Sequence, residues 1–408
     1  MGGTEMNEWK KVKLGELCDF INGGAWSDKE YASEGIPVLK VTNCKNSGFA
    51  LEDLSYLPYS LQQKYSQNEL RLHDVIIATV GSHPNLVNSS AGRSIIVNSL
   101  VIGFYLNQNA VCIRTKDSNI LNQLYLGYYS KYYIFQNYIQ MRGKGAANQM
   151  RIAISSIKGY PMPLPPIEEQ NYIATILSRY DSLIENYQKQ IKLLEEAAQR
   201  LYKEWFVDLH FPGHENTKIV DGVPEGWEKK TLSDISSIIM GQSPKSEFYN
   251  TDGNGLPFHQ GVGSYGYRFV VDNIYSTSFT RIAEPNSILF SVRAPVGRLN
   301  ITKNKIVIGR GLAAINHKMG CQSYLYYLLK EKFFKDNIIG NGAIFASISK
   351  DELYNQVFVI PSDEMVMRYD AVANKIDQNI QYVDSQIRLL TEARDRLLPK
   401  LMNGDYIV

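Results

Sequence analysis

Two stretches of the chain place apolar residues at alternating steps of four and three, and this spacing restricts the fold more than any other feature. The first run comprises Ile173, Leu177, Tyr180, Ile184, Tyr187, Ile191, Leu194, Ala198, Leu201 and Trp205. The second comprises Tyr369, Ala373, Ile376, Ile380, Val383, Ile387, Leu390, Leu397 and Leu401, with Arg394 as its one charged position. Such spacing is the heptad pattern of a coiled-coil helix. We therefore predict two long helices, the second reaching Pro399 or slightly beyond and ending before Gly404.

Each heptad stripe needs a partner helix, and the two stripes match in length and in pattern. The simplest prediction is that they pack against each other. The expected interface consists of Ile173, Leu177, Ile184, Ile191, Leu194 and Leu201 from the first helix, and Ile376, Ile380, Ile387, Leu390 and Leu397 from the second. We expect the side chain of Arg394 to turn out of the helix–helix interface toward solvent or to pair with a carboxylate. The alternative is that both stripes are core helices of a globular domain.

The two helices end two halves of the chain that share a plan. The repeated residues are Trp9, Leu14, Gly23 and Pro37 in the first half, and Trp227, Leu232, Gly241 and Pro257 in the second. Leu164-Pro165 before the first helix also answers to Ile360-Pro361 before the second. Matches that return at both ends of a half indicate a duplicated unit with a variable interior.

The remaining segments predict mixed α/β structure in both halves. Strand-like runs lie at 75–80, 94–97 and 288–292, and aromatic-rich stretches at 121–139 and 324–334 read as helices. We expect a first globular domain at 1–164 and a first helix with the start of a linker at 165–211. A second globular domain with the rest of the linker is expected at 212–361, and the second helix with a tail at 362–408. The predicted fold class is α/β (α+β) with an internal pseudo-twofold repeat.

Charge is unevenly distributed along a chain whose net charge is only +2. Between residues 75 and 167 the only acidic residue is Asp117, and between 285 and 330 there is none, although both blocks contain many Lys and Arg residues. Two such blocks favour two surfaces for a polyanion. The alternative is ordinary solvated faces.

Motifs for catalysis, metals or cofactors are not found in the sequence. The one G-x-G-x-x-G, at 261–266, precedes a strand-like run at 267–271 and not the helix that a dinucleotide site requires. His210 and His214 are separated by Pro212-Gly213, so they cannot share a helix face as metal ligands. We expect no catalytic residue, metal or cofactor in this chain. We also expect no membrane span, because no apolar run approaches roughly 18 residues, and a cytoplasmic location, because the four cysteines are scattered.

Five segments carry a specific likeness to a known family. They are PLPPIEEQ at 163–170, LYKEWFVD at 201–208, FPG at 211–213, PEGWE at 224–228 and LPKLMNG at 398–404. Together they resemble the specificity subunit of type I restriction–modification systems, in the right order over almost the whole chain.

The resemblance implies two target recognition domains, each reading one half of a split target in double-stranded DNA. It implies that the two long helices pack antiparallel and set the distance between the half-sites. The family's subunit has no catalysis of its own. It docks onto two adenine methyltransferase subunits, which use S-adenosylmethionine, and joins motor–nuclease subunits, which use ATP and magnesium.

The resemblance also suggests DNA-contacting residues. The segment 291–298 is similar to the recurrent strand–loop of a recognition domain, but its counterpart at 78–84, which includes His83 and Pro84, lacks an arginine. The expected DNA contacts are Arg93, Arg142, Lys144 and Arg151 in the first domain, and Arg268, Arg293, Arg298 and Arg310 in the second.

Two other function classes stay open on the sequence. One is an enzyme with a hidden methyltransferase site, although Pro165-Pro166 follows Leu164 and not the Asn or Asp of an N-P-P-[FY] or D-P-P-[FY] motif. The other is a non-catalytic assembly scaffold whose basic blocks meet an acidic partner.

Overall fold

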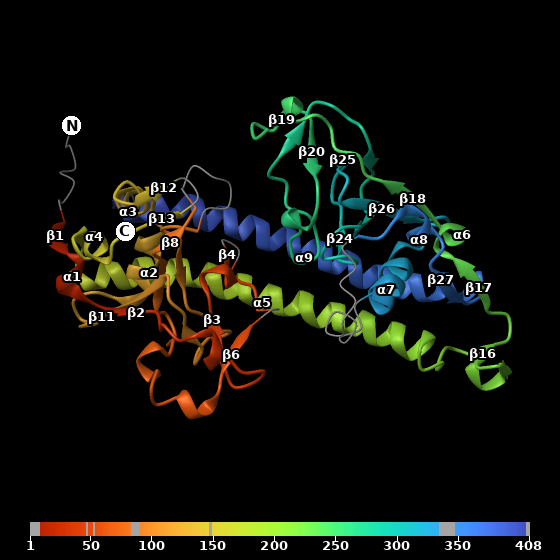
Figure 1. The fold of residues 1–408 in the computed structure, drawn as a ribbon, viewed down its shortest axis with the longest axis horizontal. Helices are drawn as coiled ribbons and strands as arrows, with labels where there is room; N and C mark the ends of the chain where they lie inside the picture. Colours follow the sequence, from red (N-terminus) through yellow and green to blue (C-terminus); the bar gives the residue numbers. More distant parts are fainter. Residues whose placement is uncertain are drawn as a thin grey trace. The chain divides into compact units, whose positions relative to one another are not determined.

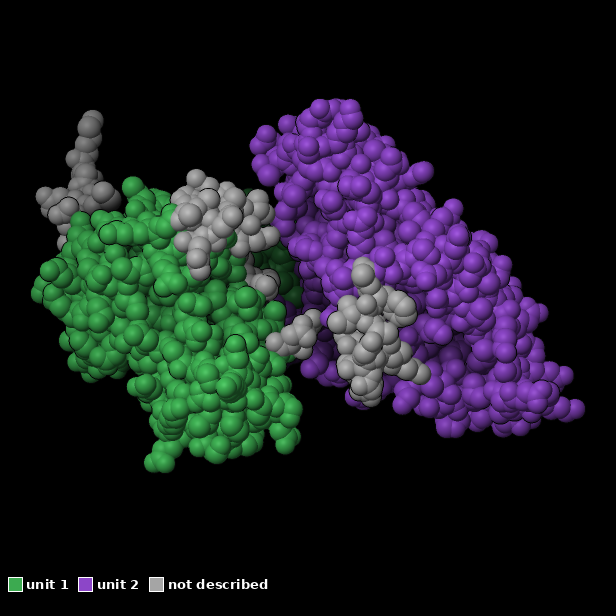
Figure 2. Space-filling view, viewed as in Figure 1, with its two compact units in different colours: residues 1–186, 387–408 green, residues 187–386 purple. Residues whose placement is uncertain are grey.

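The structure is a computed structural model that describes residues 9–45, 48–51, 54–82, 90–146, 149–333 and 347–404. It divides into two compact units, coloured separately in Figure 2. Unit 1 contains residues 1–186 and 387–408, and unit 2 contains residues 187–386. The two long helices, α5 (Ile167–Phe206) and α9 (Asp363–Asn403), each give one part to each unit (Figure 1).

Within each unit the two helices run side by side in opposite directions. In unit 1, Ile173 and Leu177 of α5 belong to the same apolar cluster as Leu401 of α9, and Asp181 pairs with Arg394. In unit 2, the Tyr369 hydroxyl of α9 donates a hydrogen bond of 2.9 Å to the backbone carbonyl of Ala198 in α5. The predicted antiparallel pairing is confirmed, and so is the prediction that Arg394 meets a carboxylate.

All eleven of the expected interface residues are removed from solvent, to different degrees. Ile173, Leu177, Ile184, Ile191 and Ile380 are buried. Leu194, Leu201, Ile376, Ile387, Leu390 and Leu397 are partly buried. Pro399 lies inside α9, which continues through it to Asn403.

The main sheets of the two units have the same strand order. In unit 1 the order is β2-β11-β7-β9, formed by Cys18–Asn22, Ala110–Thr115, Val75–Ala78 and Ser94–Ile96. In unit 2 the order is β18-β26-β23-β24, formed by Ser236–Met240, Leu312–His317, Ile288–Ser291 and Leu299–Ile301. All these pairs are antiparallel. The predicted internal repeat is confirmed at the level of topology.

A short antiparallel pair ties the start of each globular part to the strand that leads into a long helix. In unit 1, β1 (Lys10–Lys13) pairs with β14 (Pro161–Leu164), and in unit 2, β17 (Glu228–Thr231) pairs with β27 (Val357–Ile360). Each first strand runs directly into a one-turn helix, α1 (Leu14–Leu17) or α6 (Leu232–Ile235), whose first leucine is fully buried. This explains the repeated leucines, Leu14 and Leu232.

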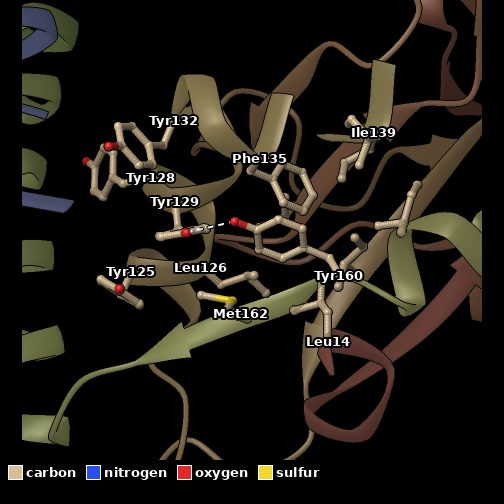
Figure 3. Packing of buried hydrophobic residues seen from close by; sticks show 14 of the residues in the cluster. Leu14, Tyr125, Leu126, Tyr128, Tyr129, Tyr132, Phe135, Ile139, Tyr160 and Met162 are labelled. Atoms are coloured by element: carbon tan, nitrogen blue, oxygen red, sulfur yellow. Dashed lines mark hydrogen bonds between the residues drawn. The ribbon is translucent and has the colours of Figure 1, made fainter. Parts of the chain in front are cut away.

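The aromatic-rich stretches form helices, as predicted. They are α2 (Gln123–Lys131) and α3 (Tyr133–Gln140) in unit 1, and α7 (Gln322–Phe333) in unit 2. Their tyrosines are largely core residues: the Tyr129 and Tyr160 hydroxyls share a hydrogen bond of 2.8 Å, and Phe135 packs edge-on against Tyr160 (Figure 3). The same cluster of buried residues includes Ile173 and Leu177 of the heptad stripe, so the globular part of unit 1 and α5 share one core.

Smaller elements complete each unit. In unit 1 they are β3 (Ile36–Leu39), β4 (Cys44–Lys45), β5 (Gly48–Phe49), β6 (Ser55–Leu57), β8 (Val80–Gly81), β10 (Tyr105–Leu106), β12 (Lys144–Ala146), β13 (Gln149–Arg151) and α4 (Ile154–Lys158). In unit 2 they are β15 (Ile219–Val220), β16 (Val223–Pro224), β19 (Tyr249–Asn250), β20 (Leu256–His259), β21 (Tyr275–Ser276), β22 (Ile282–Ala283), β25 (Ile306–Ile308) and α8 (Lys350–Tyr354). Short 3-10 helices lie at Asp28–Glu30, Val41–Asn43, Tyr59–Leu61, Ser66–Asn68, His214–Asn216, Ser246–Phe248 and Val262–Ser264.

The strand-like reading of 267–271 is wrong. This segment makes only isolated bridges, Tyr265 with Val270 and Phe269 with Ile301, and is otherwise irregular. The reason is that Arg268 turns inward from this segment to reach the long helices, as its ion pairs show.

A carboxylate on the unit's own helix anchors each globular part. The Tyr128 hydroxyl of α2 donates to Asp181 of α5 at 2.8 Å, and the Tyr327 hydroxyl of α7 donates to Asp377 of α9 at 2.9 Å. Burial raises the pKa of both tyrosines, and the facing aspartates raise it further, so the hydroxyls stay protonated and can donate.

The cation beside this carboxylate comes from a different place in each unit. In unit 1 it is Arg394 of α9, whose Nη1 lies 2.5 Å from Asp181 Oδ1. In unit 2 it is Arg268, whose guanidinium lies 2.6 Å from Asp377 and 3.1 Å from Glu195 of α5. The guanidinium also stacks on the ring of Tyr326, 3.6 Å from its centroid. Arg268 thus links the globular part of unit 2 to both long helices.

Removing this cation should loosen unit 2 selectively. In the Arg268→Ala variant, Asp377 and Glu195 would remain in a largely desolvated site without this guanidinium, with the ammonium of Lys330 3.6 Å from Glu195. We expect a loss of about 3–5 kcal/mol in the stability of unit 2, the usual cost of breaking a buried ion pair. Amide hydrogen exchange should therefore accelerate in α7 and stay unchanged in α2.

The matched control is Arg396→Ala, which removes an exposed pair with Glu392 on the surface of α9. Its expected effect is below about 1 kcal/mol. Equal exchange rates in α7 for the two variants would contradict the anchoring role of Arg268.

Candidate nucleic-acid interface

A hairpin of unit 1 displays three of the predicted contact residues together. Strands β12 and β13 pair so that Lys144 lies opposite Arg151, and both side chains are exposed. Arg142 precedes the hairpin, where its guanidinium lies 3.5 Å from the ring centroid of Tyr138 and donates to that residue's carbonyl at 3.0 Å. The hairpin is therefore a concentrated positive surface with one oriented guanidinium.

Glycines allow this hairpin to form. Gly145 has a φ of +133°, which side-chain-bearing residues rarely adopt. A Cβ on Gly143 would lie 2.5 Å from the Met150 sulfur, so a larger residue would displace the buried methionine that holds β13 against the core.

Arg93, the fourth residue predicted in unit 1, turns its guanidinium toward the protein backbone. It is partly buried, and its Nη1 donates to the Cys44 carbonyl at 2.5 Å. Burial lowers the pKa of Arg93. The guanidinium therefore makes a structural contact between the start of β9 and β4.

Unit 2 brings Arg293 and Arg310 together at the ends of two paired strands. Ser291 at the end of β23 lies opposite Leu312 at the start of β26, and the Val292 amide donates to the Gly311 carbonyl at 2.9 Å. Both arginine side chains are exposed. Beside them is a hollow of about 240 Å³ lined by Gln260, Gly261, Val262, Ser291, Arg293, Ala294 and Gly311. The hollow is therefore lined by both an uncharged hydrogen-bonding side chain, Gln260, and a cation, Arg293.

Arg298 lies on the same loop as Arg293 but is only partly exposed. Its backbone amide donates to the Ser291 hydroxyl at 2.8 Å, and the same hydroxyl donates to the Pro295 carbonyl at 2.6 Å. Ser291 thereby closes the loop 291–298 on itself and fixes the position from which Arg293 projects.

The prediction that Arg268 contacts DNA is contradicted by its burial. The side chain is 1% exposed and bound to Asp377 and Glu195, so it cannot reach a phosphate or a base. Its charge neutralises carboxylates of the long helices. In the sequence it looks like the other arginines of the second half, because its partners lie far away along the chain.

The two units present an arginine from opposite strands at the same site. In unit 1, Val80 lies opposite Arg151, and in unit 2, Arg293 lies opposite Ser347. The first half therefore lacks an arginine in its strand–loop but has one directly across from it. His83 and Pro84 of that loop lie outside the described residues.

Sequence reasoning missed the uncharged members of these surfaces. Tyr138 supports Arg142, and Gln260 lines the hollow beside Arg293. Neither carries a charge signal, and their sole signal in sequence is proximity to glycines, Gly143 and Gly261, that allow close backbone approach.

A serine, a histidine and an aspartate meet in unit 2, but their geometry does not suit catalysis. His259 Nδ1 lies 2.8 Å from the Ser264 hydroxyl, and Nε2 lies 2.9 Å from Asp272. The imidazole is 0% exposed, so it could not deliver a proton to a substrate's leaving group. The three side chains instead fasten the segment 261–272 to β20.

The described residues contain no group of three or more His, Cys, Asp or Glu side chains able to hold a metal ion. Among the same residues, no helix is both long and apolar enough to cross a membrane.

Comparison with known proteins matches this chain along both halves. The family model for the type I restriction modification DNA specificity domain matches residues 6–196 and 224–395. The MjaX specificity subunit of Methanocaldococcus jannaschii, assigned to a type I restriction enzyme, is 28% identical over 98% of this chain and 94% of its own length. The MjaVIII specificity subunit of the same organism is 23% identical over 97% of this chain and 92% of its own length.

A solved structure has the same fold. The crystal structure of the type I restriction–modification S subunit from M. genitalium superposes with a TM-score of 0.53 at 18% identity, covering 98% of each chain. The family model spans both halves of a chain whose repeated units end in antiparallel helices and expose basic groups at matching strand ends. This chain therefore belongs to the family of type I restriction–modification DNA specificity subunits.

Proposed function

We propose that each unit reads one half of a bipartite target in double-stranded DNA and that the paired helices set the distance between the halves. The observation that carries this proposal is the repeat itself. One sheet topology occurs twice, each copy exposes arginines at the same strand ends, and each copy is anchored to its helix at a matching aspartate. A reader duplicated in this way suits a target made of two different half-sites.

The proposed partners are two adenine methyltransferase subunits and motor–nuclease subunits. On this proposal S-adenosylmethionine, ATP and magnesium belong to those partners, and this chain contributes no catalytic residue. The repeat supports two copies of one partner, because its two halves present equivalent positions to solvent, such as Leu193 and Leu389, which are 65% and 49% exposed. Since the proposed substrate is duplex DNA, we also propose a cytoplasmic location.

Exchanging one globular part should change one half-site. If residues 9–160 are replaced by the matching segment of a relative, we expect a new sequence in one half of the target and no change in the other half or in the gap. The measurement is the genome-wide pattern of methylated adenine when the chimera is expressed with its methyltransferase subunit.

The control is the reverse exchange, in unit 2, which should alter only the other half. If either exchange alters both halves, the two units do not read independently. Methylation without any preferred sequence would favour the scaffold alternative.

Lengthening the helix pair should widen the gap between the half-sites. One heptad inserted into α5 after residue 186 and one into α9 after residue 386 preserves the apolar seam in both helices. Seven helical residues add about 10 Å, roughly three base pairs of B-form DNA. We expect methylated targets with the same half-sites and a gap about three base pairs longer.

Seven residues inserted in the linker at 217–218, outside both helices, provide the control and should leave the gap unchanged. An unchanged gap in the helix variant would exclude the helices as the spacing element.

The hairpin of unit 1 should contribute phosphate contacts. Replacing Lys144 and Arg151 by alanine removes two exposed cations. Each lost phosphate contact should lower the slope of log K against log salt by about one, with weaker binding of all sequences. Binding of labelled duplex DNA across a salt series measures this. Lys10→Ala and Lys29→Ala, exposed cations elsewhere in unit 1, should leave the slope unchanged. Equal slopes for the hairpin variant and the control would argue against this surface.

A further inference from the structure

The repeated glycines, Gly23 and Gly241, mark a place where two backbones cross. A Cβ on Gly23 would lie 1.9 Å from the Asn107 carbonyl oxygen, and a Cβ on Gly241 would lie 2.1 Å from the Gly309 carbonyl oxygen. Such distances exclude any side chain. In both units a glycine therefore allows the backbone to pack directly against the next loop, which leads into β11 in unit 1 and into β26 in unit 2.

Matching hydrogen bonds fix this loop in the same way in both units. Gly23 donates to Ala110 at 3.0 Å and Asn107 donates to Leu39 at 2.9 Å in unit 1, while Gly241 donates to Leu312 at 2.9 Å and Gly309 donates to His259 at 2.8 Å in unit 2. The residue that follows Asn107 is Gln108, and the residue that follows Gly309 is Arg310. These two residues are thus structural equivalents.

Each of the two has a fixed backbone and an exposed side chain. The Gln108 amide donates to the Gly24 carbonyl at 3.0 Å, and the Arg310 amide donates to the Ser243 hydroxyl at 3.3 Å. The residues immediately before them, Asn107 and Gly309, are buried, whereas the side chains of Gln108 and Arg310 face solvent. A long polar side chain on a rigid base is preorganised for a directional contact.

Both positions lie beside the arginine sites described above. Thr79, the residue before Val80, donates to Asn109 at 2.8 Å, and Val292, the residue before Arg293, donates to Gly311 at 2.9 Å. Gln108 is therefore close in the fold to the Val80–Arg151 pair, and Arg310 to the Arg293–Ser347 pair. The scaffold is the same in both units, and the side chain at its tip differs.

We propose that Gln108 and Arg310 occupy one base-reading position of the two units, with Gln108 specifying adenine and Arg310 specifying guanine. Arginine offers two parallel N–H donors that match guanine O6 and N7, and glutamine offers one donor and one acceptor that match adenine N7 and N6. The inference rests on the proposed reading of a bipartite DNA target and adds the identity of one base in each half.

The test uses the full chain with its methyltransferase subunit and a randomised pool of duplex DNA, from which bound sequences are selected and counted. The Arg310→Gln variant should lose its preference for guanine at one position of one half-site, by roughly 5- to 150-fold, the usual value of a bidentate base contact. The Gln108→Arg variant should exchange adenine for guanine at one position of the other half-site. Each variant should leave the opposite half-site unchanged.

The control is Lys229→Gln, which removes an exposed cation on β17 of unit 2 and should change no base preference. Circular dichroism melting of each variant checks that the fold is intact. An Arg310→Gln variant that binds all sequences more weakly, with the base preferences unaltered, would show a phosphate contact and overturn the proposal. A natural half-site with no required guanine would do the same. If the unmodified protein selects no bipartite sequence, the proposed function itself fails.

Discussion

In each unit, a partly buried aspartate on a long helix attaches the globular part to that helix. Asp181 and Asp377 each accept a hydrogen bond from a tyrosine of the globular part and each lie against an arginine. The tyrosines occupy equivalent places in α2 and α7, but the arginine comes from α9 in unit 1 and from a loop in unit 2. Both units therefore attach the globular part to a long helix through the same tyrosine–aspartate hydrogen bond. The arginine that neutralises the aspartate comes from a different chain segment in each unit.

The same division between preserved support and changing side chain occurs at the proposed reading surface. Gly23 and Gly241 hold equivalent loops in place because no side chain fits there. Gln108 and Arg310 lie at the tips of those loops. In the neighbouring strand pair, the arginine is on one strand in unit 1 (Arg151, opposite Val80) and on the other strand in unit 2 (Arg293, opposite Ser347). A duplicated fold can in this way keep its geometry while each copy acquires different hydrogen-bonding groups.

Much of the fold was predictable because periodicity and repetition are local signals. The heptad seam gave both helices, and the repeated Trp, Leu and Gly residues gave the duplication. The role of Arg268 was not predictable, since its partners lie 73 and 109 residues away and an inward arginine looks like an outward one in sequence. The division of both helices between the two units was also hidden, because it depends on antiparallel packing of residues from opposite ends of the chain. At the candidate site, charge pointed to the hairpin and to Arg293, and only the hydrogen-bond pattern pointed to Gln108.

The central claim is that the paired helices act as a spacer of fixed length, and the distance between the units measures this most directly. The four natural cysteines are buried, so cysteines introduced at the exposed Lys13 and Lys229 can be spin-labelled selectively, one in each unit. Pulsed electron paramagnetic resonance should then give one narrow distance distribution, which the heptad insertions in α5 and α9 displace as a single peak. A broad distribution, or several distances in exchange, would contradict a spacer of fixed length.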